Sequence, residues 1–453
     1  MKATLDGRFS GDFRASARPR RAPFACAVSG FRPTLRPEAR RPLHGRLTSI
    51  LGGCSMLKRI LAASAALAVS TALAGAQEVK VGVVLPYTGI GAEFAQLIDR
   101  GMEMYLKLNA DKVKPYQIKL IKRDAKNPGG NDARVATQEL LTQEKVDVLA
   151  GWVYSPNAIA SAPVVNAGKK FAVIMNAGTA HITQMSGYYA RTSFSMWHAG
   201  YAMGEAAAKQ LKAKTAVVGY TDFPPGKDSL NAFKRAFEAS GGKVIDEIPM
   251  GGAGAVPDFT PFFQRAKDKK PDVFFVFVPA GDHAAAVTRT YGALGMRQAG
   301  IRLIGPGDIT QDTKLQAMGD AAIGLITMHH YHADLPNAEN KRFVAEWKKA
   351  YGANAVPDFM AVGGYDGMAL IMHVAHQLKG KIDGDAAIKA AGTFKFNSPR
   401  GPISIDPDTR DIVMNEYLSE VVKGPDGRLM QKVIGQIDNV KDACKAQKIA
   451  PCK

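Results

Sequence analysis

Short apolar segments alternate with amphipathic segments along most of this sequence, and that alternation restricts the fold more than any other feature. Val79–Leu85 is apolar except for Lys80, and apolar residues then recur at helical spacing from Phe94 to Leu108. Apolar runs of this length are typical of strands buried on both faces, and their alternation with helices is typical of parallel βαβ units. We therefore expect an α/β protein.

The alternation continues through the first half of the chain and begins again after residue 193. Further strands are expected at Gln117–Arg123, Val146–Ala150, Thr215–Tyr220, Val244–Ile248, Val273–Val278 and Ile301–Ile304. Helices are expected at Ala133–Thr142, at Ser155–Gly168 and around the stripe Leu230, Phe233 and Phe237. More than ten parallel strands rarely form one open sheet, so we expect two doubly wound parallel-sheet lobes with a cleft between them.

The first 76 residues do not follow this pattern. Residues 1–55 carry a net charge of +8, out of +18 for the whole chain, and have no strand or helix periodicity. We expect them to be unstructured or untranslated. Residues 56–76 combine a basic start, an apolar run and small residues at two cleavage positions, which is typical of a signal peptide for export to the periplasm. The charge left on the folded part is modest, and we expect no nucleic-acid partner.

The cysteines also bear on whether the protein is exported. Once such a leader is removed, Cys444 and Cys452 are the two that remain, with seven residues between them. In a cytosolic protein this spacing would more often mean two unrelated thiols. Because export leads to an oxidising compartment, we expect a disulfide that ties residues 441–453 into a tail.

Hydroxyl residues follow two of the expected strands, at the edge of the sheet where ligands of open α/β folds bind. Ser155 is expected to be the N-cap of a helix with Pro156 at its first position, and Thr179 follows the next strand, beside Gly178. The unpaired N–H groups and positive dipole end of a helix suit an anion. Ser155 and Thr179 could therefore hold a carboxylate; the alternative is that Ser155 only caps its helix.

Several stretches resemble a known family when their order and spacing are taken together. They are Val81–Gly89, Arg123–Ala125, Leu149–Gly151, Asn176–Thr179, Arg191–Thr192, Ile304–Pro306 and Arg400–Pro402. From Val79 to about Asp438 the chain resembles the extracytoplasmic solute-binding proteins of the branched-chain amino acid type, the periplasmic component of ABC importers. The resemblance implies the type I periplasmic binding protein fold, with two lobes joined by a three-segment hinge.

The resemblance also implies roles for residues of the first lobe. Ser155 and Thr179 match the residues that bind the ligand's carboxylate in that family, and Ala177 and Gly178 match the backbone that joins them. Phe94 falls where an aromatic side chain packs on the ligand. In the second lobe the family presents an acid to the ligand's ammonium from a Gly-Pro-Glu loop.

This sequence departs from the family at the second lobe. Gly307 occupies the position of the acid, and Asp308 lies one residue later. A Tyr-Gly pair is replaced by a segment that begins with Phe223, while Trp152 and Tyr154 add aromatic side chains to the first lobe. We therefore expect an aromatic or other organic carboxylate as readily as an amino acid.

The expected domain bounds are 77–193 plus 330–399 for the first lobe and 194–329 plus 400–440 for the second. Hinge segments are expected near 191–195, 329–331 and 397–401. The function expected is that of the periplasmic substrate-binding component of an ABC importer, a monomer that binds a small carboxylate and delivers it to an inner-membrane ABC permease. The alternative is a ligand sensor of the same fold that acts with a signalling partner.

Enzyme activity is a weaker third option. The sequence contains no G-x-S-x-G, H-E-x-x-H, P-loop or C-x-x-C signature, so we expect no catalytic residues and no cofactor. Gly89 and Gly91 begin a dinucleotide fingerprint, but Phe94 stands in place of the third glycine. His329 and His330 would point to opposite faces of an extended segment, so no metal site is expected with His332.

Overall fold

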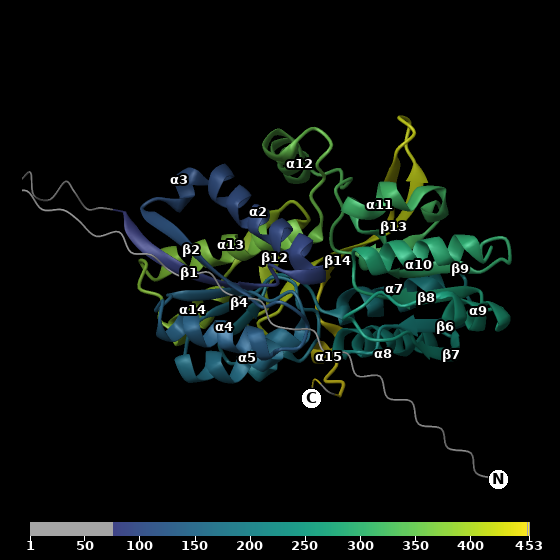
Figure 1. Ribbon diagram of the computed structural model, residues 1–453, viewed down its shortest axis with the longest axis horizontal. Coiled ribbons are helices and arrows are strands. Elements are labelled where there is room, and N and C mark those ends of the chain that lie inside the picture. The colour runs from purple at the N-terminus through teal and green to yellow at the C-terminus, as the bar shows by residue number, and fades with distance from the viewer. Residues whose placement is uncertain (1–75, 451, 453) are drawn as a thin grey trace, which may run out of the picture. The chain divides into compact units, whose positions relative to one another are not determined.

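The computed structural model describes residues 76–450 and 452, which form alternating strands and helices (Figure 1). The strands are β1 (Gln77–Leu85), β2 (Tyr116–Asp124), β3 (Val148–Gly151), β4 (Ala172–Ile174), β5 (Tyr189–Arg191), β6 (Thr215–Tyr220), β7 (Lys243–Pro249), β8 (Val273–Phe277), β9 (Arg302–Pro306), β10 (Ile326–His329), β11 (Lys395–Ser398), β12 (Gly401–Ile405), β13 (Ile412–Lys423) and β14 (Leu429–Val440). The α-helices are α2 (Ala92–Leu108), α3 (Ala110–Val113), α4 (Asn131–Thr142), α5 (Ser155–Gly168), α6 (Ile182–Met185), α7 (Met196–Lys209), α8 (Pro224–Ala239), α9 (Thr260–Asp268), α10 (Asp282–Ala293), α11 (Asp312–Met318), α12 (Ala338–Tyr351), α13 (Phe359–Gln377), α14 (Gly384–Ala391) and α15 (Ala443–Ala446). Short 3₁₀ turns lie at η1 (Gly89–Gly91), η2 (Gly307–Thr310) and η3 (Gly319–Ala322).

The first lobe is built on a parallel sheet in the order β2-β1-β3-β4-β5. Helices α2 and α13 cover one face of this sheet, and α4 and α5 cover the other (Figure 1). Val81 and Val83 of β1 pack in the core under α2 and α13, whereas Val84 packs with the α4 and α5 side. Because both faces are covered, β1 is apolar and buried from Val81 to Leu85.

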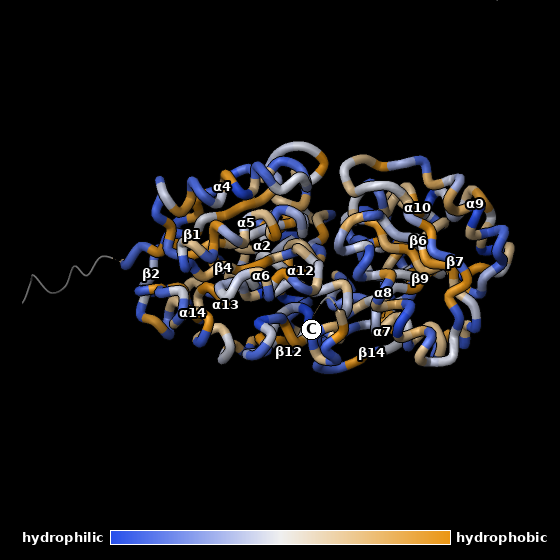
Figure 2. Tube along the Cα trace, turned by 90° about the horizontal axis from the view of Figure 1, so that it is seen from below, coloured by the Kyte–Doolittle hydropathy of each residue, from blue (hydrophilic) through white to orange (hydrophobic). Residues whose placement is uncertain are grey.

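The second lobe is built on the sheet β11-β12-β13-β10-β9-β8-β6-β7, with β14 paired to β13. Strand β8 is buried on both faces: Phe275 stacks on Phe233 of α8 with ring centroids 4.2 Å apart, and Phe274 meets Phe263 of α9 at 4.9 Å. In Figure 2 hydrophobic colouring follows interior strands such as β6, and hydrophilic colouring lies on outer loops. Each sheet is therefore covered by apolar side chains on both faces, and one apolar cluster, which includes Val81 of β1 and Phe275 of β8, extends through both lobes.

The expected α/β architecture of two doubly wound lobes is confirmed, and the expected strands lie within two residues of observed ones. The structure adds one feature that the sequence reasoning lacked. Strands β11 to β14 pair antiparallel with one another, and β13 pairs antiparallel with β10. The second sheet is therefore mixed, because its last strands are joined by short turns instead of helices.

The chain passes between the lobes three times, and the three passages meet at the buried side chain of Arg400. Its guanidinium donates to the carbonyls of Thr192 (2.5 Å) and Ser193 (2.9 Å) and to Nδ1 of His330 (3.1 Å). It also pairs with Asp366 of α13 at 2.5 Å. Apart from Asp366, these partners of Arg400 lie within two of the three segments that we expect to form the hinge, and Arg400 itself lies within the third.

The leader assigned to residues 56–76 lies outside the described residues except for Ala76, and the extension at 1–55 lies wholly outside them. Among the helices of the described part, none is long and apolar enough to cross a membrane.

Candidate ligand-binding site

A pocket with about 410 Å³ of space between its atoms, part of it open to solvent, lies where loops of the two sheets face one another. Its lining from the first lobe and the crossing segments is Phe94, Val153, Tyr154, Ser155, Asn176, Gly178, Phe194, Met196 and Met360. Its lining from the second lobe is Phe223, Pro225, Phe277, Pro279, Ala280 and Asp308.

The topology explains why these residues meet. The loops after β3 and β4 carry Ser155 and Gly178, and the segments after β8 and β9 carry Pro279 and Asp308. The carboxyl ends of parallel strands lie at one edge of a sheet, where open α/β folds bind ligands. Each lobe presents that edge to the pocket.

Five of the fifteen residues that line the pocket are aromatic. Phe94, Phe194, Phe223 and Phe277 all line it, and the rings of Phe223 and Phe277 are stacked with centroids 6.1 Å apart. The Phe94 ring reaches across to the second lobe, where a Cβ placed on Gly281 would lie 3.2 Å from its Cζ. Flat apolar walls of this kind favour an aromatic or flat apolar ligand.

Ser155 does not cap its own helix, which corrects the expectation from sequence. Helix α5 begins at Ser155, its N-cap is Tyr154, and no side chain caps it. The Ser155 Oγ instead accepts a hydrogen bond from the backbone N–H of Thr179 at 3.1 Å. The hydroxyl proton of Ser155 and its N–H, which has no acceptor within the helix, remain at the positive end of the helix dipole.

Four of the nineteen buried polar side-chain atoms that lack a hydrogen-bond partner in the described part of the chain lie in or beside the pocket. They are the Tyr154 hydroxyl, Asn176 Oδ1, Thr179 Oγ1 and Asp308 Oδ2. Leaving a buried polar group unpaired costs about 1–3 kcal/mol, so such groups are normally satisfied by a ligand or by water. The grouping identifies this pocket as the best candidate for a binding site.

Asp308 is the one ionisable acid or base, apart from the phenol of Tyr154, that lines the pocket. Its side chain is only 6% exposed, and burial raises the pKa of its carboxyl from 3.8 to about 7. Burial likewise raises the pKa of Tyr154 to about 12, so its hydroxyl stays neutral. Near neutral pH the pocket can therefore offer Asp308 as a hydrogen-bond donor as well as an acceptor.

The residue before Asp308 could not carry an acid without rearrangement. A Cβ built on Gly307 would lie 2.4 Å from Cγ of His329, so the imidazole fills the space beside this glycine. Burial lowers the pKa of His329 to about 4, which keeps the ring neutral. The acid of this loop is therefore Asp308 alone.

The structure brings most of the predicted site residues together. Six of the nine line the pocket: Phe94, Tyr154, Ser155, Gly178, Phe223 and Asp308. Ala177 and Thr179 lie beside them on the loop after β4, where the Ala177 N–H donates to the carbonyl of Trp152 at 2.9 Å. Their contact with a ligand remains a prediction.

Trp152 is the exception, and its placement in the pocket was wrong. Its indole N–H donates to Ser161 Oγ at 3.0 Å, and its ring packs edge-on against Tyr189 at 5.5 Å. The side chain is fully buried in the core on the α4 and α5 side of the sheet. Trp152 follows the last residue of β3 with a φ of 59°, and this conformation directs its side chain to that core, whereas the next residue, Val153, lines the pocket.

Sequence reasoning missed the lining residues that come from the crossing segments and from α13. Phe194 and Met196 lie just after β5, and Met360 lies in the first turn of α13, far along the chain from the other residues. Phe194 could have been suspected because it lies inside an expected hinge segment. No local pattern distinguishes Met360 from an ordinary core residue.

The three neighbouring histidines have structural partners. His329 Nδ1 lies 3.2 Å from the Tyr331 carbonyl, and His332 Nε2 lies 3.1 Å from Ser419 Oγ. The rings of His329 and His330 lie 4.3 Å apart, so the expectation that they face opposite sides was wrong. The strand β10 ends at His329, and alternation does not extend to the next residue.

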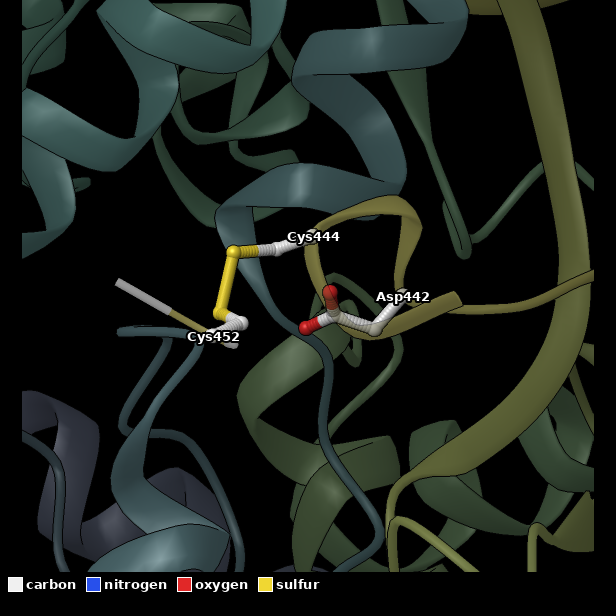
Figure 3. Close-up of side chains that lie close together, drawn as sticks. All are labelled: Asp442, Cys444 and Cys452. Carbon is white, nitrogen blue, oxygen red and sulfur yellow. A yellow bond between two sulfur atoms is a disulfide. The ribbon is translucent and has the colours of Figure 1, made fainter. Parts of the chain in front are cut away.

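Within the described residues, the one group of three close metal-ligating side chains is Asp442, Cys444 and Cys452 (Figure 3). The two sulfur atoms are joined in a disulfide, at 2.17 Å. Because both sulfurs are used in that bond, a single carboxylate remains, which does not make a metal site.

Two lobes that enclose a small pocket between the ends of their sheets define a class of small-molecule binding protein. The chain matches the family model for periplasmic binding proteins over residues 78–426 and belongs to that family. It is 36% identical over 394 residues to Leu/Ile/Val-binding protein homolog 6 of Brucella melitensis biotype 1, covering 86% of this chain and 100% of that protein.

Solved structures similar to this chain are also solute-binding proteins. A solute-binding protein of an ABC transporter from Rhodopseudomonas palustris BisB5, in complex with 3,4-dihydroxybenzoic acid, is 42% identical with a TM-score of 0.77, over 81% of this chain and 99% of that one. Another, from Rhodopseudomonas palustris HaA2 in complex with p-hydroxybenzoic acid, is 34% identical with a TM-score of 0.78, over 82% and 100%. This protein is thus an ABC-transporter solute-binding protein, a transport component and not an enzyme.

Proposed function

We propose that this protein binds a small aromatic carboxylate, such as a hydroxybenzoate, in the pocket between its lobes and delivers it to an ABC permease of the inner membrane. The observation that carries the proposal is the make-up of the pocket. One end has Ser155 at the start of α5, the walls are phenylalanines, and the acid in the lining is Asp308. A flat ring with a carboxylate at one end and a hydroxyl elsewhere matches these three features.

The carboxylate end is supported by hydrogen-bond donors. The Ser155 hydroxyl proton, the first N–H of α5 and the unpartnered hydroxyl of Thr179 can all donate to an anion. Such charge-assisted bonds are stronger than neutral ones. No lysine or arginine lines the pocket, so the helix end supplies the positive potential.

The second lobe argues against an aliphatic amino acid. An α-ammonium group needs an ionised acid close to it, but Asp308 is protonated to a large extent near neutral pH, and the Gly307 position is blocked by His329. A ligand hydroxyl can instead accept from or donate to the Asp308 carboxyl. The two Rhodopseudomonas proteins, which are bound to dihydroxy- and hydroxybenzoic acid, support the same ligand class.

The remaining parts of the proposal concern movement and location. We propose that the lobes, 77–193 plus 330–399 and 194–329 plus 400–440, close about the ligand by rotation at the segments that meet at Arg400. The protein acts as a monomer in the periplasm, reached through the leader at 56–76, with Cys444 and Cys452 oxidised there. The family acts outside the cytoplasm, which agrees with export.

Calorimetric titration of the purified mature protein with 4-hydroxybenzoate, benzoate and leucine tests the ligand class. We expect micromolar or tighter binding of 4-hydroxybenzoate and at least about tenfold weaker binding of leucine. Tighter binding of leucine than of either aromatic acid would overturn the proposal. Mass spectrometry of small molecules released from the protein on denaturation would identify the ligand directly.

A further inference from the structure

The buried side chain of Arg191 holds the loop that follows β4, residues 176–181, through hydrogen bonds. The Arg191 guanidinium donates to the carbonyls of Ala177 (3.2 Å), Thr179 (2.7 Å) and Ala180 (3.3 Å). Arg191 is fully buried at the end of β5. Because the loop turns these carbonyls toward Arg191, the Thr179 N–H is left to face Ser155. We call residues 176–181 the ligand loop.

The charge of Arg191 is balanced through the C-terminal tail, which is Asp442–Ala450 with Cys452. Arg191 Nε donates to Asp411 at 2.6 Å, and Lys445 of the tail forms an ion pair with the same carboxylate. Asp442 of the tail lies 3.8 Å from Arg191. Burial alone would raise the pKa of Asp411, but the Arg191 and Lys445 charges hold it below its ordinary value. Two cations and two carboxylates therefore form one closed, buried cluster.

The tail also packs directly against the ligand loop. Ala180 belongs to the same apolar cluster as Cys444, Cys452 and Trp197. Lys445 Nζ donates to Thr183 Oγ1 at 2.6 Å, just beyond the end of the loop. The disulfide joins Cys452 to Cys444, so both ends of the tail lie in this apolar cluster (Figure 3).

The ligand loop is connected to the second lobe at the same point. The Ala180 N–H donates to Asp228 of α8 at 2.8 Å. Burial raises the pKa of Asp228 to about 6, and the side chain is only 5% exposed. The position of the ligand loop therefore affects the contact between the lobes as well as the first-lobe side of the pocket.

We propose that Arg191 and the disulfide-tied tail are positioning elements of the ligand pocket. They hold the ligand loop so that Thr179 and Gly178 meet the ligand, and loss of the tail contacts loosens this loop more than the rest of the fold and weakens ligand binding. A disulfide that closes so short a loop stabilises the fold less than one that closes a long loop, and it also holds the tail locally against the ligand loop. The inference extends the proposed function and depends on it for the identity of the ligand.

Two variants and one control test this role. Cys444→Ala combined with Cys452→Ala removes the disulfide and keeps the charges, and Lys445→Met removes the charge and keeps the disulfide. Lys448→Met is the control, because Lys448 is an exposed lysine of the same tail. Amide hydrogen exchange is measured over residues 176–185 and over β1 and β8, together with the affinity for 4-hydroxybenzoate and the thermal midpoint.

We expect much faster exchange over residues 176–185 in both test variants, a smaller increase in β1 and β8, and a rise of about fivefold to thirtyfold in Kd. The control should match the parent in all three measurements. Unchanged exchange in the ligand loop, or an equal increase throughout the chain, would overturn the positioning role. If Lys445→Met does not fold, the disulfide variant decides the question in the same way.

The exchange measurement needs no ligand, so it separates this inference from the proposed function. A parent protein that binds none of the aromatic acids, with locally faster exchange in the variants, would overturn the ligand class and leave the support of the loop standing. A parent that binds 4-hydroxybenzoate, with variants of equal affinity, would overturn the positioning role.

Discussion

The Ser155 hydroxyl oxygen accepts a hydrogen bond from the backbone N–H of Thr179 at 3.1 Å, which joins the first turn of α5 to the loop after β4. Both hydroxyl residues that sequence reasoning assigned to a carboxylate are thus parts of one buried arrangement. The Thr179 Oγ1 and the proton of Ser155 are left for a ligand. This arrangement makes the effect of replacing Ser155 predictable.

Ser155→Ala should lose a charge-assisted hydrogen bond to the ligand carboxylate. The expected loss is about 1.5–3 kcal/mol of binding free energy, a rise in Kd of roughly tenfold to more than a hundredfold. The variant also leaves the Thr179 N–H without its acceptor, which should cost about 1 kcal/mol of stability. Titration calorimetry and urea unfolding measure the two effects separately.

A matched control for this variant is Asp383→Ala, which removes the side chain that caps α14. It should cost a similar amount of stability, about 1 kcal/mol, with no change in affinity. Equal affinity of Ser155→Ala and the parent for every ligand that the parent binds would show that the site lies elsewhere.

The affinity for benzoate should depend on pH through Asp308. In the free protein burial raises the pKa of this carboxyl to about 7, so ionisation above that pH places a second negative charge beside the bound anion. Kd for benzoate should therefore rise by up to about tenfold per pH unit above pH 7. Asp308→Asn should remove most of this dependence, and titrations from pH 6 to pH 9 give the comparison. Identical profiles in the two proteins would contradict the assignment.

Stability should change with pH in the same variant. Because the folded-state pKa of Asp308 is raised above the unfolded value of 3.8, the protonated carboxyl contributes stability at low pH that is lost between about pH 4 and pH 7. From pH 4.5 to pH 7.5 the free energy of unfolding of the parent should fall, relative to that of Asp308→Asn, by roughly 2–4 kcal/mol. Urea denaturation at the two pH values measures the difference, and a parent that gains stability relative to the variant would contradict the prediction.

Gly307 and His329 should be energetically coupled. A Cβ at 307 would lie 2.4 Å from the imidazole, so Gly307→Ala should cost about 1–3 kcal/mol of stability through overpacking. In His329→Ala the same methyl group should be tolerated. A double-mutant cycle by urea unfolding should therefore give a coupling energy of about 1 kcal/mol or more, whereas additive effects would mean that the ring moves aside freely.

Much of the architecture could be predicted from sequence because its signals are local. Val79–Leu85 reads as a buried strand, and Ser155 followed by Pro156 marks a helix start to within one residue. The roles of Ser155 and Trp152 could not be predicted from the residues next to them in the sequence. Whether a serine caps its own helix or binds a neighbouring loop depends on how β3 and β4 are placed, and the direction of Trp152 depends on its conformation after the strand, with a φ of 59°.

Part of the second-lobe side of the pocket could also be predicted from the sequence. Asp308 could be named because it follows a strand, although its burial depends on the packing of the closed pocket. The β13–β14 pair was missed because β13 is buried along most of its length and its sequence, which includes Asn415 and Glu416, does not alternate between polar and apolar residues. Long-range contacts such as Met360 in the pocket lining follow only from the tertiary fold.

Contacts across the cleft should stabilise the closed arrangement of the lobes, and Gln311 makes the most buried of them. Its Nε2 donates to Asp358 of the first lobe at 2.5 Å, and its Oε1 accepts from the Gly281 N–H at 2.7 Å. Asp358 in turn caps α13, whose first turn carries Met360 into the pocket. Gln311 therefore connects the lining of both lobes without touching the ligand.

Gln311→Ala should weaken the binding of 4-hydroxybenzoate and benzoate by the same factor, about fivefold to thirtyfold, because it removes a closing contact and leaves the pocket's selectivity unchanged. The control is Lys314→Ala, which breaks an ion pair with Glu93 across the same cleft at 2.6 Å. That pair is partly exposed, so its loss should cost at most about 1 kcal/mol, or fivefold in Kd. Calorimetry with both ligands measures the two affinities. A change in their ratio would place Gln311 at the ligand. Equal affinities in the variant and the parent would show that closure does not depend on Gln311.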